Sequence, residues 1–204
     1  PDEANPNSGV ANKYSNDGTS EFLPLESADA EGTEVARLTG AQLYTGMMAT
    51  VARIKSVRSP GILHVATHAF ALSKAATPKE SKDQKAIRFP STSDDAEARS
   101  GLAFAGINRV IRGMRVPPEV EDGVLSALEV ASLSLSGTQL AVLSACDTAR
   151  GDLHSGEGVI GLRRAFSIAG AGATITSLWP APDRQTKMLI GAFFHHVQRG
   201  ASFA

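Results

Sequence analysis

The sequence has one cysteine, one tryptophan and few aromatic residues of any kind, with Phe, Tyr and Trp making up 5% of 204 residues. One cysteine excludes an internal disulfide, and no apolar signal region stands at the N-terminus, so we expect a reducing cytoplasm. No apolar run approaches the roughly 18 residues of a membrane span. Basic and acidic residues number 20 and 21, so no overall field attracts nucleic acid or an anionic membrane. A neutral, globular partner or substrate is the default.

The first 20 residues also have almost no large apolar side chains. They are rich in Asn, Ser, Gly, Asp and Pro, which cannot offset the entropy lost on ordering, so we interpret residues 1–20 as a flexible tail. The remaining 21–204 is the right length for one domain. Within it, residues 73–100 are charged and contain Pro78 and Pro90, which predicts a long loop of the kind that is functional or disordered.

Apolar periodicity predicts helices alternating with strands, which is typical of an α/β fold with a parallel sheet between helices. The expected helices are 27–38, 47–57, a short one opened by the Ser-x-x-Glu capping box at 126–129, 159–169 and 183–199. The expected strands are 41–44, 62–66, 101–106, 138–145 and 173–179. On the last helix, the apolar stripe is predicted at Leu189, Ala192, Phe193 and Val197, with His196 bordering the core.

Two reactive side chains follow the ends of predicted central strands. His68 comes just after the strand at 62–66, and Cys146 just after the strand at 138–145. In parallel α/β folds, functional groups gather outside the carboxyl ends of the strands. Cys146 is therefore either a nucleophile activated by His68 or a small residue buried at a strand end. His64 is interpreted as a histidine of the core or of the strand face.

Two motif matches carry no cofactor or metal prediction. "HVATH" has two histidines four apart, but its apolar neighbours favour a strand and no Glu follows the first His, as a zinc protease motif requires. "GEGVIG" lies about ten residues past its strand, too far for a dinucleotide fingerprint. Asp147, Asp152 and Glu157 fit no metal loop and favour a solvated loop. We therefore expect no metal and no cofactor.

Four blocks in order, "ILHVATHAF", "LSACDTARG", "GEGVIGLRRAFSIAGA" and "TSLWPAPD", resemble the CHAT domain, a caspase-like and separase-like cysteine protease family. The resemblance runs from about residue 22 to the end. It implies a caspase-like three-layer αβα sandwich around a mainly parallel sheet, with His68 as general base and Cys146 as nucleophile. Backbone N–H groups of Ala69 and Cys146 are the expected donors to the oxyanion.

The chain departs from the family pattern in two places. Ala69 stands where the family usually has Gly, whose backbone freedom Ala lacks. The family also continues past "RGASFA" with a helical segment, so we expect a fragment of a longer protein. A bacterial source is expected as well.

The block "SLWPAPD" resembles the pocket of separases that receives a basic P1 side chain. Asp183 occupies the acidic position, where a carboxylate would select Arg or Lys; alternatively it only caps the last helix. Ser144 resembles a position that lines the pocket, and Ser177 to Trp179 could pair with an extended peptide.

The resulting hypothesis is a cysteine endopeptidase acting on a protein or peptide substrate, with a preference for a basic P1 residue. The alternative is a catalytically silent interaction module that keeps the fold. A regulatory helical-repeat domain or partner protein is the expected companion in either case, because the family is often joined to such repeats.

Overall fold

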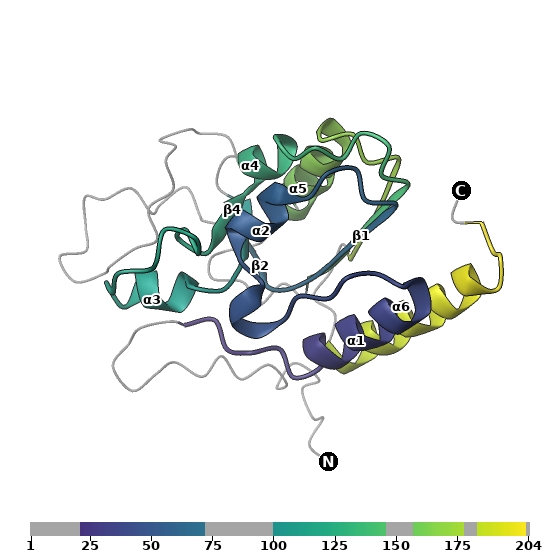
Figure 1. Ribbon diagram of the computed structural model, residues 1–204, viewed down its shortest axis with the longest axis horizontal. Helices are drawn as coiled ribbons and strands as arrows, with labels where there is room; N and C mark the ends of the chain where they lie inside the picture. Colours follow the sequence, from purple (N-terminus) through teal and green to yellow (C-terminus); the bar gives the residue numbers. More distant parts are fainter. Residues whose placement is uncertain (1–20, 72–99, 146–156, 178–182, 203–204) are drawn as a thin grey trace, which may run out of the picture.

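A computed structural model describes residues 21–71, 100–145, 157–177 and 183–202 (Figure 1). The predicted tail at 1–20 and nearly all of the predicted loop at 73–100 lie outside these ranges, as do Cys146 and Trp179. The other predicted elements and site residues can be compared with the structure directly.

The central sheet is parallel, in the order β1-β5-β6. Its strands are β1 (Ile62–Ala66), β5 (Leu140–Ser144) and β6 (Ala173–Thr176). Every residue of β5 is buried, as the unbroken apolar run at this strand predicts. β1 and β6 are only partly buried because each has one neighbour among the described strands, so the predicted third core strand is an edge strand here.

A second, antiparallel sheet follows β1 directly. It consists of β2 (Ala69–Ala71), β3 (Ser100–Ala103) and β4 (Val124–Ser126) in that order. Ser126 ends β4 and caps α4 (Ala127–Ala131), with Glu129 completing the predicted capping box. The switch from parallel to antiparallel pairing occurs at Thr67 and His68, between β1 and β2.

Helices cover both sides of the sheets (Figure 1). α1 (Ala28–Thr39) and α6 (Asp183–Gln198) lie side by side on one face of the parallel sheet. α2 (Val51–Ser56), α4 and α5 (Glu157–Ile168) pack on the opposite face. The short helix α3 (Ile107–Ile111) packs with Phe22 and Phe70 on the antiparallel sheet. This arrangement confirms the predicted α/β sandwich of three layers.

Strand residues alternate regularly between the two faces. In β1, β2 and β5, odd-numbered residues such as Val65, Ala69 and Leu143 belong to the core beneath α2, α4 and α5. Even-numbered residues of these three strands belong to the opposite layer, where Val142 packs under α1 and α6 and Phe70 packs against Phe22 and α3. The alternation passes from β1 to β2 without a change of phase.

The segment before β1 is less regular than predicted. Residues 41–44 do not form a strand, and the helix predicted at 47–57 divides into the 3-10 turn η1 (Gly46–Met48) and α2. Thr50 causes the division, because its extended backbone starts α2 anew and its side chain accepts a hydrogen bond from the N–H of Arg53.

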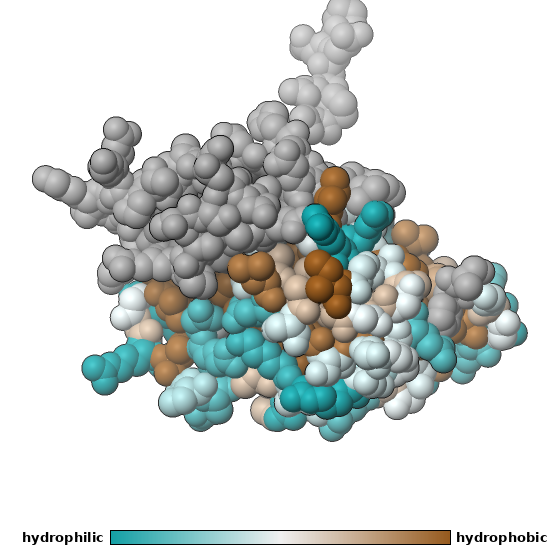
Figure 2. Space-filling view, turned by 90° about the horizontal axis from the view of Figure 1, so that it is seen from above, coloured by the Kyte–Doolittle hydropathy of each residue, from teal (hydrophilic) through white to brown (hydrophobic). Residues whose placement is uncertain are grey.

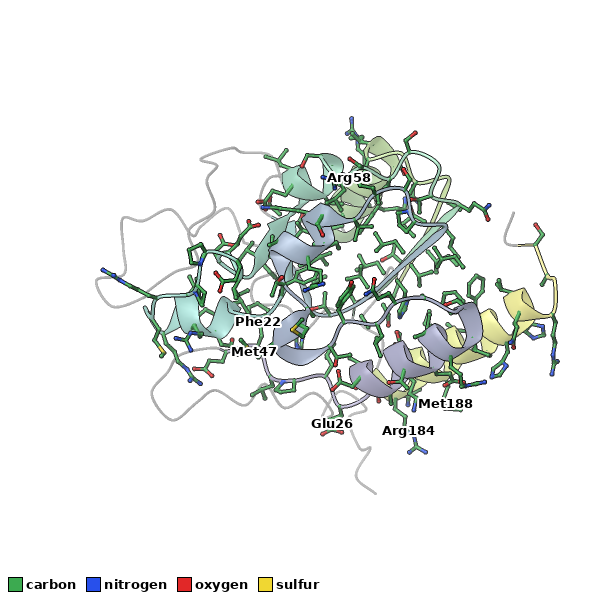
Figure 3. All side chains as sticks on the ribbon, viewed as in Figure 1. Phe22, Glu26, Met47, Arg58, Arg184 and Met188 are labelled. Carbon is green, nitrogen blue, oxygen red and sulfur yellow. The ribbon has the colours of Figure 1, made fainter. Side chains whose placement is uncertain are left out.

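The apolar stripe predicted on α6 is displaced by about one residue from the side chains that are buried, so this prediction is wrong. Leu189 is 68% exposed, and Met188 and Arg184 project away from the body of the molecule (Figure 3). The buried side chains belong to Thr186, Ile190, Gly191 and Phe194. α6 faces α1 as well as the sheet, and Gly191 admits the carboxylate of Glu34, so a small residue occupies the contact. His196, expected beside the core, is exposed.

Exposed apolar side chains are scattered over the surface. On the face seen in Figure 2, hydrophobic residues occur as separate groups among hydrophilic ones. The exposed large apolar residues of the described chain come from several elements: Leu23, Leu43, Met47, Met48, Met114, Leu128, Ile160, Ile168, Met188 and Leu189. Scattered exposure of this kind is normal for a globular protein.

A buried acid–base pair joins α1 to β1. His64 lies 2.9 Å through Nε2 from Oε1 of Glu31, and their side chains are 9% and 2% exposed. The His64 ring also packs edge-on against Phe194 of α6. Among the described residues, Nδ1 of His64 has no hydrogen-bond partner, so Glu31 supplies the one polar contact of a buried imidazole. The pair therefore fixes α1 against β1 at one position.

Replacing Glu31 is expected to destabilise the fold strongly. Glu31→Ala should lower the free energy of unfolding by about 3 kcal/mol, because both ring nitrogens of His64 would then be buried without a partner. The measurement is urea unfolding followed by circular dichroism.

Glu34→Ala is the matched control for this experiment. Glu34 lies on the same helix and contacts His195 at 3.3 Å, but both side chains are substantially exposed, so its loss should be below about 1 kcal/mol. Equal losses in the two variants would show that the buried pair has no special role.

Candidate functional site

The carboxyl ends of β1 and β5 lie next to each other. Ala66 pairs with Ser144 in register, and the N–H of Thr67 donates to the carbonyl of Ser144 at 3.1 Å, which extends the pairing by one residue. The Thr67 hydroxyl donates to the carbonyl of Ala103 and so ties the strand end to β3. The two segments that follow β1 and β5 therefore leave the parallel sheet side by side, at the carboxyl ends of the strands.

His68 follows β1 by two residues, as predicted, and its ring is partly buried. On β5, the described chain ends at Ala145, which is buried and directly precedes Cys146. Neighbouring strands of a sheet are about 4.8 Å apart. The described residues thus bring His68 close to the chain that leads into Cys146, while the contact between the two side chains lies outside the described residues.

One segment that contacts His68 was not predicted from the sequence to belong to the site. Residues 21–27, here called the strap, run from α3 to the start of α1 (Figure 1). The carbonyl oxygen of Leu23 lies 2.6 Å from Nε2 of His68, and the ring of Phe22 packs 5.5 Å from the imidazole between centroids. The strap has no periodic pattern of its own, and the only signal of its role was an apolar "FLPL" after a polar tail.

The Leu23 carbonyl determines which nitrogen of His68 carries the proton. A carbonyl oxygen only accepts, so Nε2 is the donor in this hydrogen bond. In the neutral ring, Nδ1 is then the nitrogen with the lone pair. The strap therefore holds His68 in the tautomer that can accept a proton at Nδ1.

Burial lowers the pKa of His68 below its usual value. The Leu23 carbonyl and the charge of Asp183 act in the opposite direction, since both favour the protonated ring. The burial effect is the largest, so the imidazole is kept neutral at pH values somewhat below those of an exposed histidine.

Asp183 is the first residue of α6, and its carboxylate accepts the backbone N–H of Ser27 at 2.6 Å. Ser27 is the N-cap residue of α1, and its own side chain makes no capping hydrogen bond. Asp183 thus stands at the N-termini of two helices, where a negative charge is favourable. It caps α1 through this bond, and its predicted contact with a P1 side chain stays a prediction.

The remaining predicted site residues lie around the same strand ends. Ser144 is buried at the end of β5, and the hydroxyl of Ser177 donates to the carbonyl of Ala145 at 3.1 Å. Ala69 is the first residue of β2 and pairs with Leu102. Its φ angle is not positive, since the described non-glycine residues with positive φ are Ser59 and Glu121. Alanine at this position therefore carries no backbone strain of the kind that glycine relieves.

Residues 3–204 match the family model described as "CHAT domain". The chain belongs to the CHAT domain family. This result confirms the resemblance seen in the four sequence blocks and agrees with the caspase-like layering of the fold. No solved structure matches the chain.

Two curated relatives of this CHAT domain are mammalian. Tetratricopeptide repeat protein 28 of Homo sapiens is 30% identical over 190 residues, and that of Mus musculus is 29% identical over 179 residues. Each alignment covers 87% of this chain and 7% of the relative. The chain therefore spans a small part of the proteins it resembles, and the comparisons give no support to a bacterial source.

No helix among the described residues is long and apolar enough to cross a membrane. No three His, Cys, Asp or Glu side chains in the described ranges gather closely enough to hold a metal ion.

Removing the charge of Asp183 should lower the pKa of His68 further. In Asp183→Asn, the amide oxygen can still accept the N–H of Ser27, but the negative charge that favours the imidazolium is gone. An NMR titration of the imidazole measures the change. Glu34→Gln, which alters a carboxylate beside His195 instead, should leave the His68 titration unchanged, and a shift of equal size there would contradict the assignment to Asp183.

Proposed function

We propose that this CHAT domain is a cysteine endopeptidase in which His68 is the general base and Cys146 the nucleophile. The observation that carries the proposal is the hydrogen bond between His68 and the Leu23 carbonyl at the end of β1. It holds an imidazole at the carboxyl edge of the sheet, in the tautomer that a general base requires.

The register of the sheet supports the pairing of the two residues. His68 lies two positions beyond Ala66, Cys146 lies two positions beyond Ser144, and Ala66 and Ser144 are partners. Strand alternation gives His68 the same phase as His64, which faces the α1 and α6 side. The equal offsets of His68 and Cys146 from two register partners favour an approach of the imidazole to the thiol.

The chemistry follows the usual course of a thiol peptidase. Nδ1 of His68 takes the thiol proton, and the thiolate sulfur bonds to the scissile carbonyl carbon. Backbone N–H groups of Ala69 and Cys146 hold the oxyanion. The imidazolium returns its proton to the amine as the C–N bond breaks, and water, deprotonated by His68, then attacks the thioester to release the acid and the thiol. The lowered pKa of His68 keeps the base neutral when the reaction starts.

The substrate is proposed to be a protein or peptide with a basic P1 residue. Asp183 lies close enough for its charge to act on His68, so a cation bound by this carboxylate would sit near the reacting groups. Ser144 and Ser177 border the same strand ends, and Trp179 completes the proposed peptide-binding strand. A reducing compartment is part of the proposal, because the thiol must stay free.

Labelling of the single cysteine tests the nucleophile. With His68 as base, iodoacetamide should alkylate Cys146 about tenfold faster than it alkylates free cysteine at neutral pH. His68→Ala should abolish this advantage and lower the cleavage of an arginine-containing peptide library by about 100-fold or more. His195→Ala, which changes a partly exposed histidine of α6, is the control and should do neither. Ordinary thiol reactivity in the native protein would reject the enzyme.

The ratio of two substrates tests the P1 preference. Asp183→Asn keeps the acceptor for Ser27, so any general effect on the fold lowers kcat/KM equally for peptides with Arg or Leu at P1. A pocket that uses the charge predicts about tenfold more loss with Arg than with Leu. Equal losses would leave Asp183 with its capping role alone.

An interaction module without turnover is the second candidate. It is favoured by the relatives, which are named for tetratricopeptide repeats and are much longer than this chain. A neighbouring helical-repeat domain, or a partner protein, would then use residues 21–204 as a folded binding unit beside the predicted tail at 1–20. Ala69 in place of the family's Gly would favour this candidate if the substitution strained the backbone, but the φ angle of Ala69 is not positive. Failure of the labelling experiment would favour it.

A further inference from the structure

We propose that Asn108 of α3 is a positioning residue, which holds the Leu23 carbonyl over His68 by fixing the strap, with Arg112 assisting. This inference rests on the proposed function, in which His68 is the base. Asn108 lies 86 residues from Phe22 in the chain and its side-chain amide binds the Phe22 backbone, so its effect on His68 would be transmitted through the strap.

Asn108 binds the backbone of Phe22 in both directions. Its Oδ1 accepts the Phe22 N–H at 2.9 Å, and its Nδ2 donates to the Phe22 carbonyl at 2.8 Å. The side-chain amide thus gives the N–H and the carbonyl of Phe22 the two hydrogen bonds that a neighbouring strand could otherwise supply. Phe22, which is labelled in Figure 3, is 9% exposed and belongs to the same apolar cluster as Phe70 and Ile107. The residue directly before Leu23 is therefore fixed in position and in peptide orientation.

Arg112 holds the strap one residue earlier. Its Nε and Nη2 each lie 2.6 Å from a different carboxylate oxygen of Glu21, a two-point pairing that fixes direction as well as distance. Asn108 and Arg112 are four residues apart and so share one face of α3. The Arg112 side chain is 55% exposed, so its contribution is smaller than that of Asn108.

The far end of the strap is fixed by the bond from Ser27 to Asp183. Between the two ends, the Leu23 side chain is 50% exposed and adds little packing of its own. The position of the Leu23 carbonyl is therefore determined by the hydrogen bonds at the two ends of the strap. Without the α3 anchor, a displacement of about 1 Å would break the hydrogen bond to Nε2 and let the ring turn away from the thiol.

Asn108→Ala tests the positioning role. With the arginine peptides described above, kcat should fall on the order of 10- to 100-fold with KM little changed, because the anchor orients the base and does not touch substrate. In the nitrogen-15 NMR spectrum, the Nε2–H proton of His68, protected from exchange by the Leu23 carbonyl, should be visible in the native protein and lost in the variant.

Arg109→Ala is the matched control on the same helix. Arg109 is exposed and its guanidinium binds the carbonyl of Arg115, not the strap. It should keep both the protected proton and the native kcat. Thermal unfolding shows whether Asn108→Ala is folded; if it is not, Arg112→Ala takes its place, with the same direction of change and a smaller size.

The kcat measurement and the NMR measurement together separate this inference from the proposed function. A native protein that cleaves no peptide would end the enzyme proposal, and the NMR signal would still decide the anchor. A folded Asn108→Ala protein that retains the protected His68 proton and the native kcat would overturn the positioning role. Loss of the His68 proton signal in Arg109→Ala as well would also overturn the positioning role, because the loss would then not be specific to the contact between Asn108 and the strap.

Discussion

The parallel pairing of β1 with β5 is the constraint on which the site depends. Because Ala66 lies opposite Ser144, two segments that are far apart in sequence leave the sheet at the same edge. The turn at Thr67 and His68 then sends the chain into an antiparallel sheet, so His68 sits where the two sheets meet. A shift of the register by one residue would move the imidazole to the opposite face. The position of the proposed base is therefore determined mainly by the pairing of the strand backbones.

The layer above this edge is held by polar contacts as much as by apolar packing. Glu31 and His64 fix α1 to β1, Asp183 joins the starts of α1 and α6, and Asn108 holds the strap. Glu31 and the His64 ring are buried and would be costly to leave without their partners, whereas Asp183 and Asn108 are half-buried. Such directional contacts define orientation more narrowly than apolar contacts do, which suits the proposed role of His68 as an oriented base.

Much of the fold could be predicted from local pattern. The buried strand β5, the capping box at Ser126 and the α5 face with Leu162 and Phe166 all follow from residue types at short spacing. The strap could not be predicted in this way, because its structure comes from partners such as Asn108, 86 residues away. The face of α6 was misassigned because hydrophobicity favours Leu189, whereas the contact with α1 requires a small residue at Gly191. At the site, strand ends identified His68, but only tertiary structure identified Leu23.

The contact between α1 and α6 has a consequence for biosynthesis. Ser27 and Asp183 are 156 residues apart, so α1 cannot complete its packing until the ribosome has released the segment that becomes α6. The strap joins α1 to α3, and its far anchor is therefore also completed late. A nascent chain would carry the imidazole without its full support, so the order of translation itself would suppress the proposed peptide-bond cleavage in an unfinished protein.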